Sequence, residues 1–189
     1  MSTEVDGVEV LFDGVPAPLA VVSGLVIEAV APLEIDGKNT VGVTVQYGGM
    51  ISNTEILGVL PAVPGILGVY AGALDAPAAP GSIVSLAVIG SGVTIPPQTD
   101  GQIGGPPSVP ALPVSVWLGA PPTFGPPIAW IPLKVTYAGS ASWLPAGSIQ
   151  VNVQLPDPLP ATNDGGYFIA VQVGASLSAD TFLQANPGQ

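Results

Sequence analysis

Few side chains in this sequence could do chemistry, and most of those are carboxylates. The 189 residues include 13 Asp and Glu but no His and no Cys, so the usual general base and the thiol nucleophile are both missing. Lys38 and Lys134 are the only basic residues, and a Ser-Lys pair would need one of them. Lys38 lies in a predicted turn, and Lys134 lies in a predicted strand on its outward face. We therefore expect neither lysine to be catalytic.

A pair of carboxylates could hydrolyse a glycosidic bond, and three acidic residues lie close together in the sequence. They are Glu28, Glu34 and Asp36, within the segment IEAVAPLEIDG. This segment has the pattern of a strand that is stopped by proline and followed by a turn, which places the charges on the outward side. The sequence therefore predicts that the chain is not an enzyme and needs no cofactor.

Two turns carry the oxygen-rich residues that a calcium ion prefers. They are DGKN, with Asp36 and Asn39, and NDGG, with Asn163 and Asp164. Neither turn has the spacing of an EF-hand or of a nonapeptide array. The same residue types are also what tight hairpins need for a positive φ. We expect no metal site, and calcium at these two turns remains the alternative.

The aromatic residues are concentrated in one part of the chain. All three tryptophans fall between residues 117 and 143, and Phe124 and Tyr137 lie among them. We expect Trp117 in the core. Trp130, Trp143 and Phe124 could anchor proline-rich loops, contact another subunit or stack on the apolar face of a sugar. These alternatives stay open at the level of the sequence.

The charge of the chain excludes some classes of partner. Two lysines against 13 acidic residues give a formal net charge of −11. Nucleic acids are excluded, because neutralising phosphates requires clustered Lys and Arg. Anionic membrane surfaces would repel the chain for the same reason. We also expect no signal peptide, because the opening residues MSTEVDG have neither a basic nor an apolar region.

One uncharged stretch has the length of a membrane span. Residues 56–74 carry no charge over 19 positions, but they include Pro61 and Pro64 and have no cluster of basic residues nearby. We interpret the stretch as a buried strand followed by a linker, and we expect no membrane insertion.

An internal repeat determines the predicted fold. Three segments of the first half return later in the chain: VTVQYGGMIS at 43–52 as IAVQVGASLS at 169–178, LVIEAVAP at 25–32 as IQVNVQLP at 149–156, and FDGVP at 12–16 as WLGAP at 117–121. Each copy is a series of short strands separated by Gly, Pro, Asn or Asp turns. We predict an all-β chain of two immunoglobulin-like antiparallel sandwiches in tandem, over residues 1–66 and 67–189.

The second copy has a front strand that the first copy lacks. The strand SIVSLAVIG, residues 82–90, and a loop rich in proline and glycine precede the turn strand VSVWLG of the second copy. Only seven residues precede the matching strand VEVLF in the first copy. We therefore expect the first sandwich to be one strand short.

These turn and strand signatures resemble a known family. PGSIVSLAVIGSG, the paired turns in VLFDGVPAPL and VWLGAPP, and the units IEAVAP and VNVQLP are similar to the uncharacterised β-rich C-terminal module of large secreted proteins that are common in acidobacteria. The resemblance implies an immunoglobulin-like sandwich and a secreted or cell-surface location. It brings no catalytic residues.

The sequence thus predicts an extracellular structural subunit. A sandwich that lacks a strand exposes unpaired backbone groups, which another strand can pair with. In a longer parent chain, upstream residues would supply that strand, and a smaller sandwich that closes on itself would need none. If instead a second copy supplies it, which is the alternative we favour, the chains polymerise head to tail into a filament. The candidate donors are the terminal segments STEVDGVEVLF and SADTFLQANPGQ. The alternative function is a carbohydrate-binding or adhesive surface module that uses Trp130 and Trp143, with polysaccharide as the partner.

Overall fold

The computed structural model describes residues 1–71, 77–120, 129–162 and 166–185, and it confirms the all-β fold class. The strands are joined by turns and by one short 3₁₀ helix, η1, at Leu33–Ile35. No helix within these ranges is long and apolar enough to cross a membrane.

The strands β1 to β7, here called the first half, form a small sheet and a separate hairpin. The sheet has the antiparallel order β2-β1-β5-β6, with β7 also paired to β5, and the hairpin is β3-β4. Only Val10, Ala17 and Leu19 form its buried cluster. The strand bounds are β1 Val8–Phe12, β2 Val15–Pro16, β3 Leu19–Val22, β4 Ile27–Ala29, β5 Thr40–Tyr47, β6 Met50–Ile51 and β7 Glu55–Gly58.

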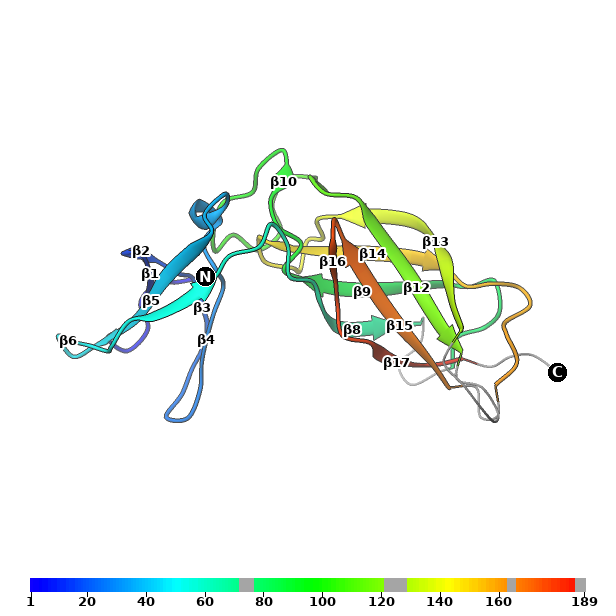
Figure 1. Cartoon of the computed structure of the whole chain (residues 1–189), viewed down its shortest axis with the longest axis horizontal. Coiled ribbons are helices and arrows are strands. Elements are labelled where there is room, and N and C mark those ends of the chain that lie inside the picture. The colour runs from blue at the N-terminus through cyan, green and yellow to red at the C-terminus, as the bar shows by residue number, and fades with distance from the viewer. Residues whose placement is uncertain (72–76, 121–128, 163–165, 186–189) are drawn as a thin grey trace.

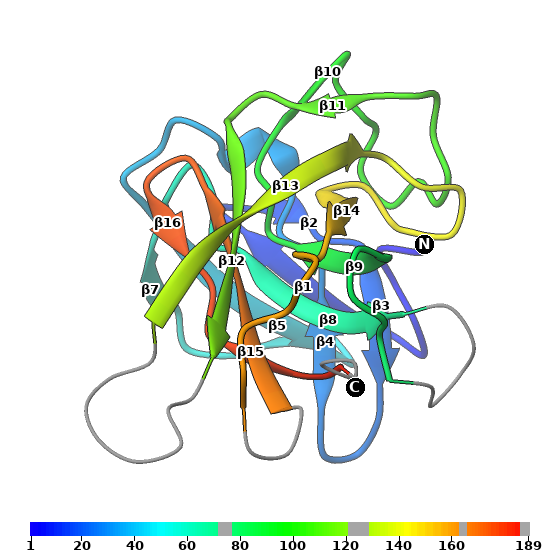
Figure 2. The ribbon, with the colours of Figure 1, turned by 90° about the vertical axis from the view of Figure 1, so that its right-hand side faces the viewer.

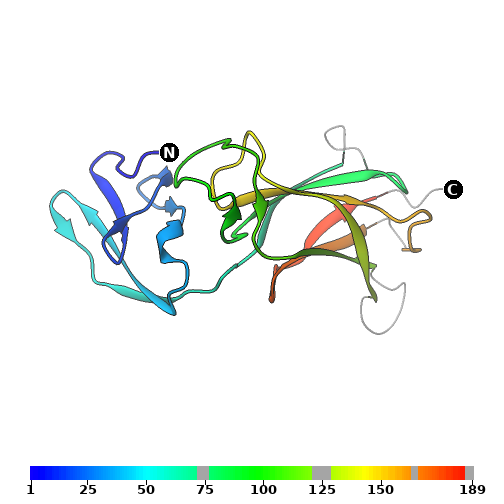
Figure 3. The same cartoon turned by 90° about the horizontal axis from the view of Figure 1, so that it is seen from above.

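The strands β8 to β17, here called the second half, contain the main core. The large sheet has the order β16-β15-β12-β13-β14-β9-β8, with β17 also paired to β15. The long strand β13 pairs with β12 through its first part and with β14 through its second part, so the sheet folds into two layers (Figures 2 and 3). The bounds are β8 Gly65–Tyr70, β9 Ile83–Ile89, β10 Thr94–Ile95, β11 Val109–Pro110, β12 Val114–Ala120, β13 Ala129–Gly139, β14 Ser148–Gln154, β15 Gly166–Val173, β16 Ser176–Leu177 and β17 Thr181–Gln184.

Period-2 alternation explains why these segments are strands with one buried face. In β14, Ile149, Val151 and Val153 are fully buried, whereas Gln150 and Asn152 between them are half-buried on the outer face. Their inward partners include Val84, Leu86 and Val88 of β9, which are also fully buried. The core of the second half therefore lies between layers of aliphatic, largely β-branched residues.

The strand registers reproduce the sequence repeat. Val43 pairs with Glu55 in the first half, and Ile169 pairs with Thr181 in the second, both shifted by 126 residues. The turn chemistry also returns, because Ser52 Oγ accepts the Val45 N–H at 3.0 Å and Ser178 Oγ accepts the Val171 N–H at 3.0 Å. The strands β5, β6 and β7 thus correspond to β15, β16 and β17.

The hairpin β3-β4 corresponds to β13-β14, and the two pairs share a local irregularity. The register shifts between Leu19 and Val21 in the first pair and between Val135 and Tyr137 in the second. The two strand pairs therefore share a β-bulge at the same position.

Two details of the predicted repeat are wrong. Val8 pairs with Tyr47 and Val114 with Val173, so β1 and β12 are offset by 106 residues and not by 105. The expected match of Gly14 with Gly119 fails, because Gly14 has φ +84° in a turn whereas Gly119 lies within strand β12.

The predicted boundary after residue 66 falls inside β8, which pairs with β9 of the second half.

The two halves lie side by side and are joined by residues 59–64 (Figure 1). The N-terminus lies near the junction between the halves (Figures 1 and 3). The hairpin β3-β4 projects from the first half with its turn away from the sheet (Figure 1).

Candidate functional site

One edge of the first half is open where the second half is closed. In the second half, β14 lies between β13 and β9. Its counterpart β4 pairs with β3 on one side, and on the other side it meets no strand among the described residues. In the register of β9 on β14, Val84 is opposite Val153 and Leu86 is opposite Val151. The corresponding positions of β4 are Ala29 and Ile27.

Inward-facing side chains of the first half are uncovered as a result. Each of three apolar residues is far more exposed than its counterpart in the second half: Ile27 37% against Val151 0%, Leu57 45% against Leu183 3%, and Tyr47 58% against Val173 0%. Outward-facing residues show no such contrast, since Ile56 is 63% exposed and its counterpart Phe182 is 56% exposed. The difference is therefore specific to the face that β8 and β9 cover in the second half.

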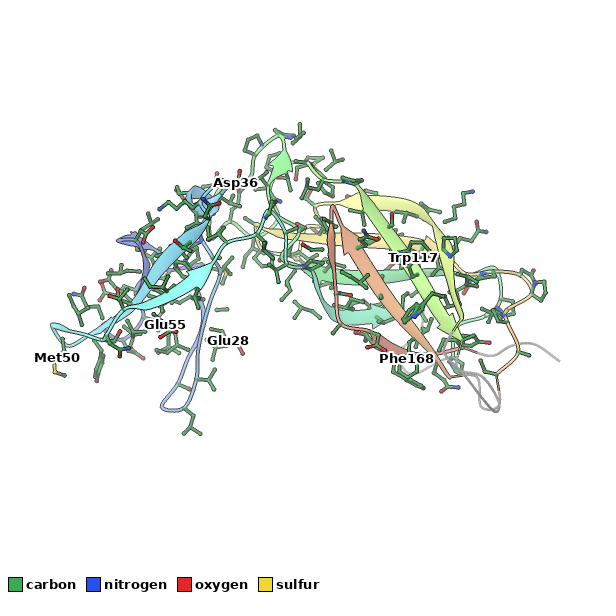
Figure 4. All side chains as sticks on the ribbon, in the orientation of Figure 1. Glu28, Asp36, Met50, Glu55, Trp117 and Phe168 are labelled. Carbon is green, nitrogen blue, oxygen red and sulfur yellow. The ribbon has the colours of Figure 1, made fainter. Side chains whose placement is uncertain are left out.

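The open edge borders a groove of about 820 Å³. Strands β4 and β7 of the first half form one side of it, and the linker and the adjacent ends of β8 and β9 form the other. Its lining is mostly apolar and includes Ile27, Leu57, Leu60, Leu67 and Ile89. Glu28 of β4, labelled in Figure 4, and Asp36 are acidic residues of this lining. We call this feature the β4 groove.

A carboxyl contact joins the two halves beside the β4 groove. Both carboxylate oxygens of Asp100 accept the backbone N–H of Leu33, at 3.1 and 3.0 Å. Partial burial, and then the neighbouring Glu34, raise the pKa of Asp100 to about 6. A hydrogen bond from Asp100 lowers the pKa of Glu34. The Met1 ammonium also donates to the carbonyl oxygen of Gly101.

The first candidate calcium turn, DGKN, has its oxygen-bearing side chains in solvent. Asp36 ends η1 and is exposed, as is Asn39. Within the described ranges, no three or more acidic side chains are placed so that together they could hold a metal ion. Lys38, in the same turn, donates to Asp13 Oδ2 at 2.7 Å, and this bond lowers the pKa of Asp13. Asn163 and Asp164 lie outside the described residues.

The structure does not bring the candidate aromatic residues together. Trp130 lies in the first part of β13, opposite Gly119. Trp143 lies in the loop after β13, and its ring packs edge-to-face on that of Tyr70, with 5.9 Å between the ring centroids. Phe124 lies outside the described residues. Trp117 is half-buried between the inward-facing Val116 and Leu118 and so faces outward, which corrects the expectation that it lies in the core (Figure 4).

Sequence reasoning missed a second depression, on the outer face of the second half. It has a volume of about 270 Å³ and is lined by Tyr137, residues 140–143, Gln150 and Asn152. Tyr137 pairs with Asn152 across β13 and β14, and Gln150 and Asn152 alternate with buried residues. The alternation of polar residues in IQVNVQ was the available signal. We call this feature the Trp143 pocket.

Comparison with known proteins gives little further information. No family model and no curated protein matches the chain. Among solved structures, it is similar to a crystal structure of domains 4 and 5 of the S-layer protein SbsC, with 17% identity, 98% of this chain and 74% of that chain covered, and a TM-score of 0.26. A likeness at this level carries no argument about function.

Proposed function

We propose that the chain is a non-enzymatic, extracellular structural subunit that joins its neighbours head to tail by β-strand complementation. The observation that carries this proposal is the open edge of β4 beside uncovered apolar side chains. The extracellular location rests on the sequence resemblance alone.

The proposal interprets both halves as immunoglobulin-like sandwiches. In the second half, β8, β9 and β14 belong to one layer, and β12, β15 and β17 belong to the other. The first half has counterparts of β12 to β17 but none of β8 and β9 among the described residues. On this interpretation the described residues of the first half form a sandwich without the two strands at one edge, whereas the sequence predicts that one strand is missing.

The missing element has to be an extended segment. The layer opposite β4 is already occupied by β1, β5 and β7 of the same chain. Suppose that the first half of another molecule paired edge to edge with β4. The sheet of that molecule would then occupy the same space as β1 and β5. A single strand or hairpin avoids this conflict, pairs with the open backbone edge and covers Ile27 and Leu57.

Of the two terminal segments, the N-terminal one is the better donor. Thr181–Gln184 is strand β17, which pairs with β15 along its whole length, and Leu183 is buried in the core. Residues 2–7 are mostly exposed and are held by few bonds, among them Leu19 N–H to Ser2 O at 2.8 Å. Releasing the N-terminal segment therefore costs its chain less. Donation from one chain to the next in a fixed direction produces an open filament.

The charge distribution supports growth in one direction over lateral bundling. The formal charge is −11, and the single ion pair among the described residues is Lys38 with Asp13. Surfaces with the same sign of charge repel one another, and few cations are available to bridge them. Apolar strand addition does not depend on such bridges.

A matched pair of substitutions on β7 tests the proposal. Leu57 faces the β4 groove, and its neighbour Ile56 faces outward and is at least as exposed. In sedimentation velocity and electron microscopy, the unchanged chain and Ile56→Asp should assemble with rising concentration, whereas Leu57→Asp should stay monomeric. Thermal unfolding of the monomers checks that both variants remain folded. A monomeric unchanged chain, or assembly of Leu57→Asp equal to that of Ile56→Asp, would refute polymerisation through this site.

Deleting residues 2–7 tests the donor separately. We expect the shortened chain to lose self-assembly but to keep an open β4 groove. A chain shortened by residues 186–189 is the control, because it removes a similar length from the other end. Undiminished assembly after deletion of residues 2–7 would exclude the N-terminal segment as the donor.

A further inference from the structure

The Trp143 pocket lies on the outer face of the second half, where β13 ends and β14 begins. Its floor is the outward face of β14, and its walls come from Tyr137 and the loop at 140–143. At about 270 Å³ it is smaller than most pockets for drug-sized ligands. It therefore suits one small ring with the rest of the ligand in solvent.

Two aromatic side chains border the pocket in fixed positions. Trp143 contacts Tyr70 edge-to-face at an interplanar angle of 85°, and both rings are half-exposed. The Tyr137 hydroxyl donates to the carbonyl oxygen of Ser140 at 2.6 Å. The Tyr137 ring passes close over Gly139, where an added Cβ would lie 2.8 Å from that hydroxyl. The glycine thus permits the position of the ring.

The polar floor presents a hydrogen-bond donor and a hydrogen-bond acceptor. Gln150 Nε2 donates to Asn152 Oδ1 at 2.8 Å, which fixes the orientation of both amides. This orientation leaves Gln150 Oε1 as an acceptor and Asn152 Nδ2 as a donor. Neighbouring hydroxyl groups of a sugar, each both donor and acceptor, match such a pair.

The loop does not need the indole of Trp143 as its anchor. Leu144, the next residue, is buried, and the Gly104 N–H donates to its carbonyl oxygen at 3.1 Å. Ser108 also holds the loop, because the Ser140 N–H donates to the backbone carbonyl oxygen of Ser108 at 2.9 Å. With the loop fixed by these contacts, half of the Trp143 side chain remains in solvent without a structural role there.

We propose that the Trp143 pocket binds an uncharged saccharide. Trp143 stacks on the apolar face of one pyranose ring, and Gln150 and Asn152 bond to its hydroxyl groups. No charged residue lines the pocket, and the chain as a whole is strongly negative, so anionic polysaccharides are disfavoured. This site is separate from the β4 groove and does not depend on polymerisation.

Titration calorimetry with two uncharged probes, cellotetraose and the tetramer of N-acetylglucosamine, tests the proposal. We expect at least one probe to bind, and Trp143→Ala to weaken that binding about tenfold or more, as removal of a central aromatic contact does. Asn152→Ala should weaken it by a smaller factor. Trp130→Ala is the matched control, since Trp130 is similarly exposed but lies about seven residues from Tyr137 along β13, roughly 23 Å.

The outcomes are distinct. Binding that Trp143→Ala weakens and Trp130→Ala leaves unchanged supports the site. Binding that survives Trp143→Ala overturns it. Binding of an anionic third probe, polygalacturonate, without binding of either uncharged probe also overturns it. No binding of either uncharged probe at about 10 mM also overturns it. Trp143→Phe keeps an aromatic ring, so partial retention of affinity by this variant separates stacking from a general loss of fold.

Discussion

Supplying the missing strand from within the chain should stabilise the first half. The variant carries a second copy of residues 82–90 ahead of Met1, joined by a flexible Gly/Ser linker of about fifteen residues. Together with residues 1–7, this linker approaches the length of the natural connection between β9 and β12, which is residues 90–113. The added strand should pair with β4 in the register of β9 on β14, with Leu86 of the copy opposite Ile27.

The magnitude follows from what the strand covers. Full burial of an aliphatic side chain contributes about 1.5–3 kcal/mol, so covering the exposed parts of Ile27 and Leu57 contributes about 2 kcal/mol. Within the added strand, burial of three side chains and the roughly three ladder bonds that β4 can offer nearly balance the cost of ordering its backbone, about 10 kcal/mol. A net gain of about 2 kcal/mol raises the Tm of a unit of this size by about 10 °C.

The control variant carries the same extension with Val84→Ser, Leu86→Ser and Val88→Ser in the added copy. These three side chains are fully buried in β9, and losing them removes about 6 kcal/mol, more than the expected gain. The control strand should therefore stay undocked. Differential scanning calorimetry measures the Tm, and hydrogen exchange measures protection of the β4 amides. Equal Tm and equal β4 protection in the two variants would show that the groove is not a strand site.

Three further predictions concern the junction and the core. The pKa of Asp100 is raised from 3.8 to about 6, so its ionisation disfavours folding, and stability is lost as pH rises from about 4 to 6. Asp100→Asn should therefore gain about 1 kcal/mol at pH 7, allowing for solvent screening, and little at pH 4, and urea unfolding at both pH values checks this. The lowered pKa of Glu34 acts in the opposite direction, but that side chain is exposed. Gly90→Ala would place a Cβ against the carbonyl oxygen of Val63 at φ +65°, so we expect a loss of more than 1 kcal/mol in thermal unfolding. Ser108→Ala removes the one buried side-chain oxygen without a hydrogen-bond partner among the described residues, and should leave stability unchanged or raise it by about 1 kcal/mol.

The sequence repeat predicted much of the fold because strand pattern and turn chemistry return together. The serines Ser52 and Ser178 illustrate this, since each bonds to the strand before it in the same geometry. An alternation of apolar and polar residues also determines which face is buried, as in β14. The all-β class and the open edge follow from these local rules.

The sequence could not predict contacts between segments that lie far apart in it. Gly14 and Gly119 occur in similar short motifs, but only Gly14 needs a positive φ, because β12 continues where β1 ends. The contact of Asp100 with Leu33 spans 67 residues and depends on how the halves meet. The aromatic cluster was also misleading, since proximity in sequence did not bring Trp130 and Trp143 together.

The residue pattern of the first half favours a covered open face. A pair of sheets that functions with this face in water would be expected to carry polar residues at its inward positions. Instead, Ile27, Leu57 and Tyr47 occupy those positions, while Thr44 and Gln46 occupy outward positions of β5. A shift of register by one residue would reverse this arrangement, so the pattern specifies one face. The pattern matches that of the second half, where β8 and β9 cover the same face. A covering strand therefore explains both the sequence of the first half and its exposed side chains.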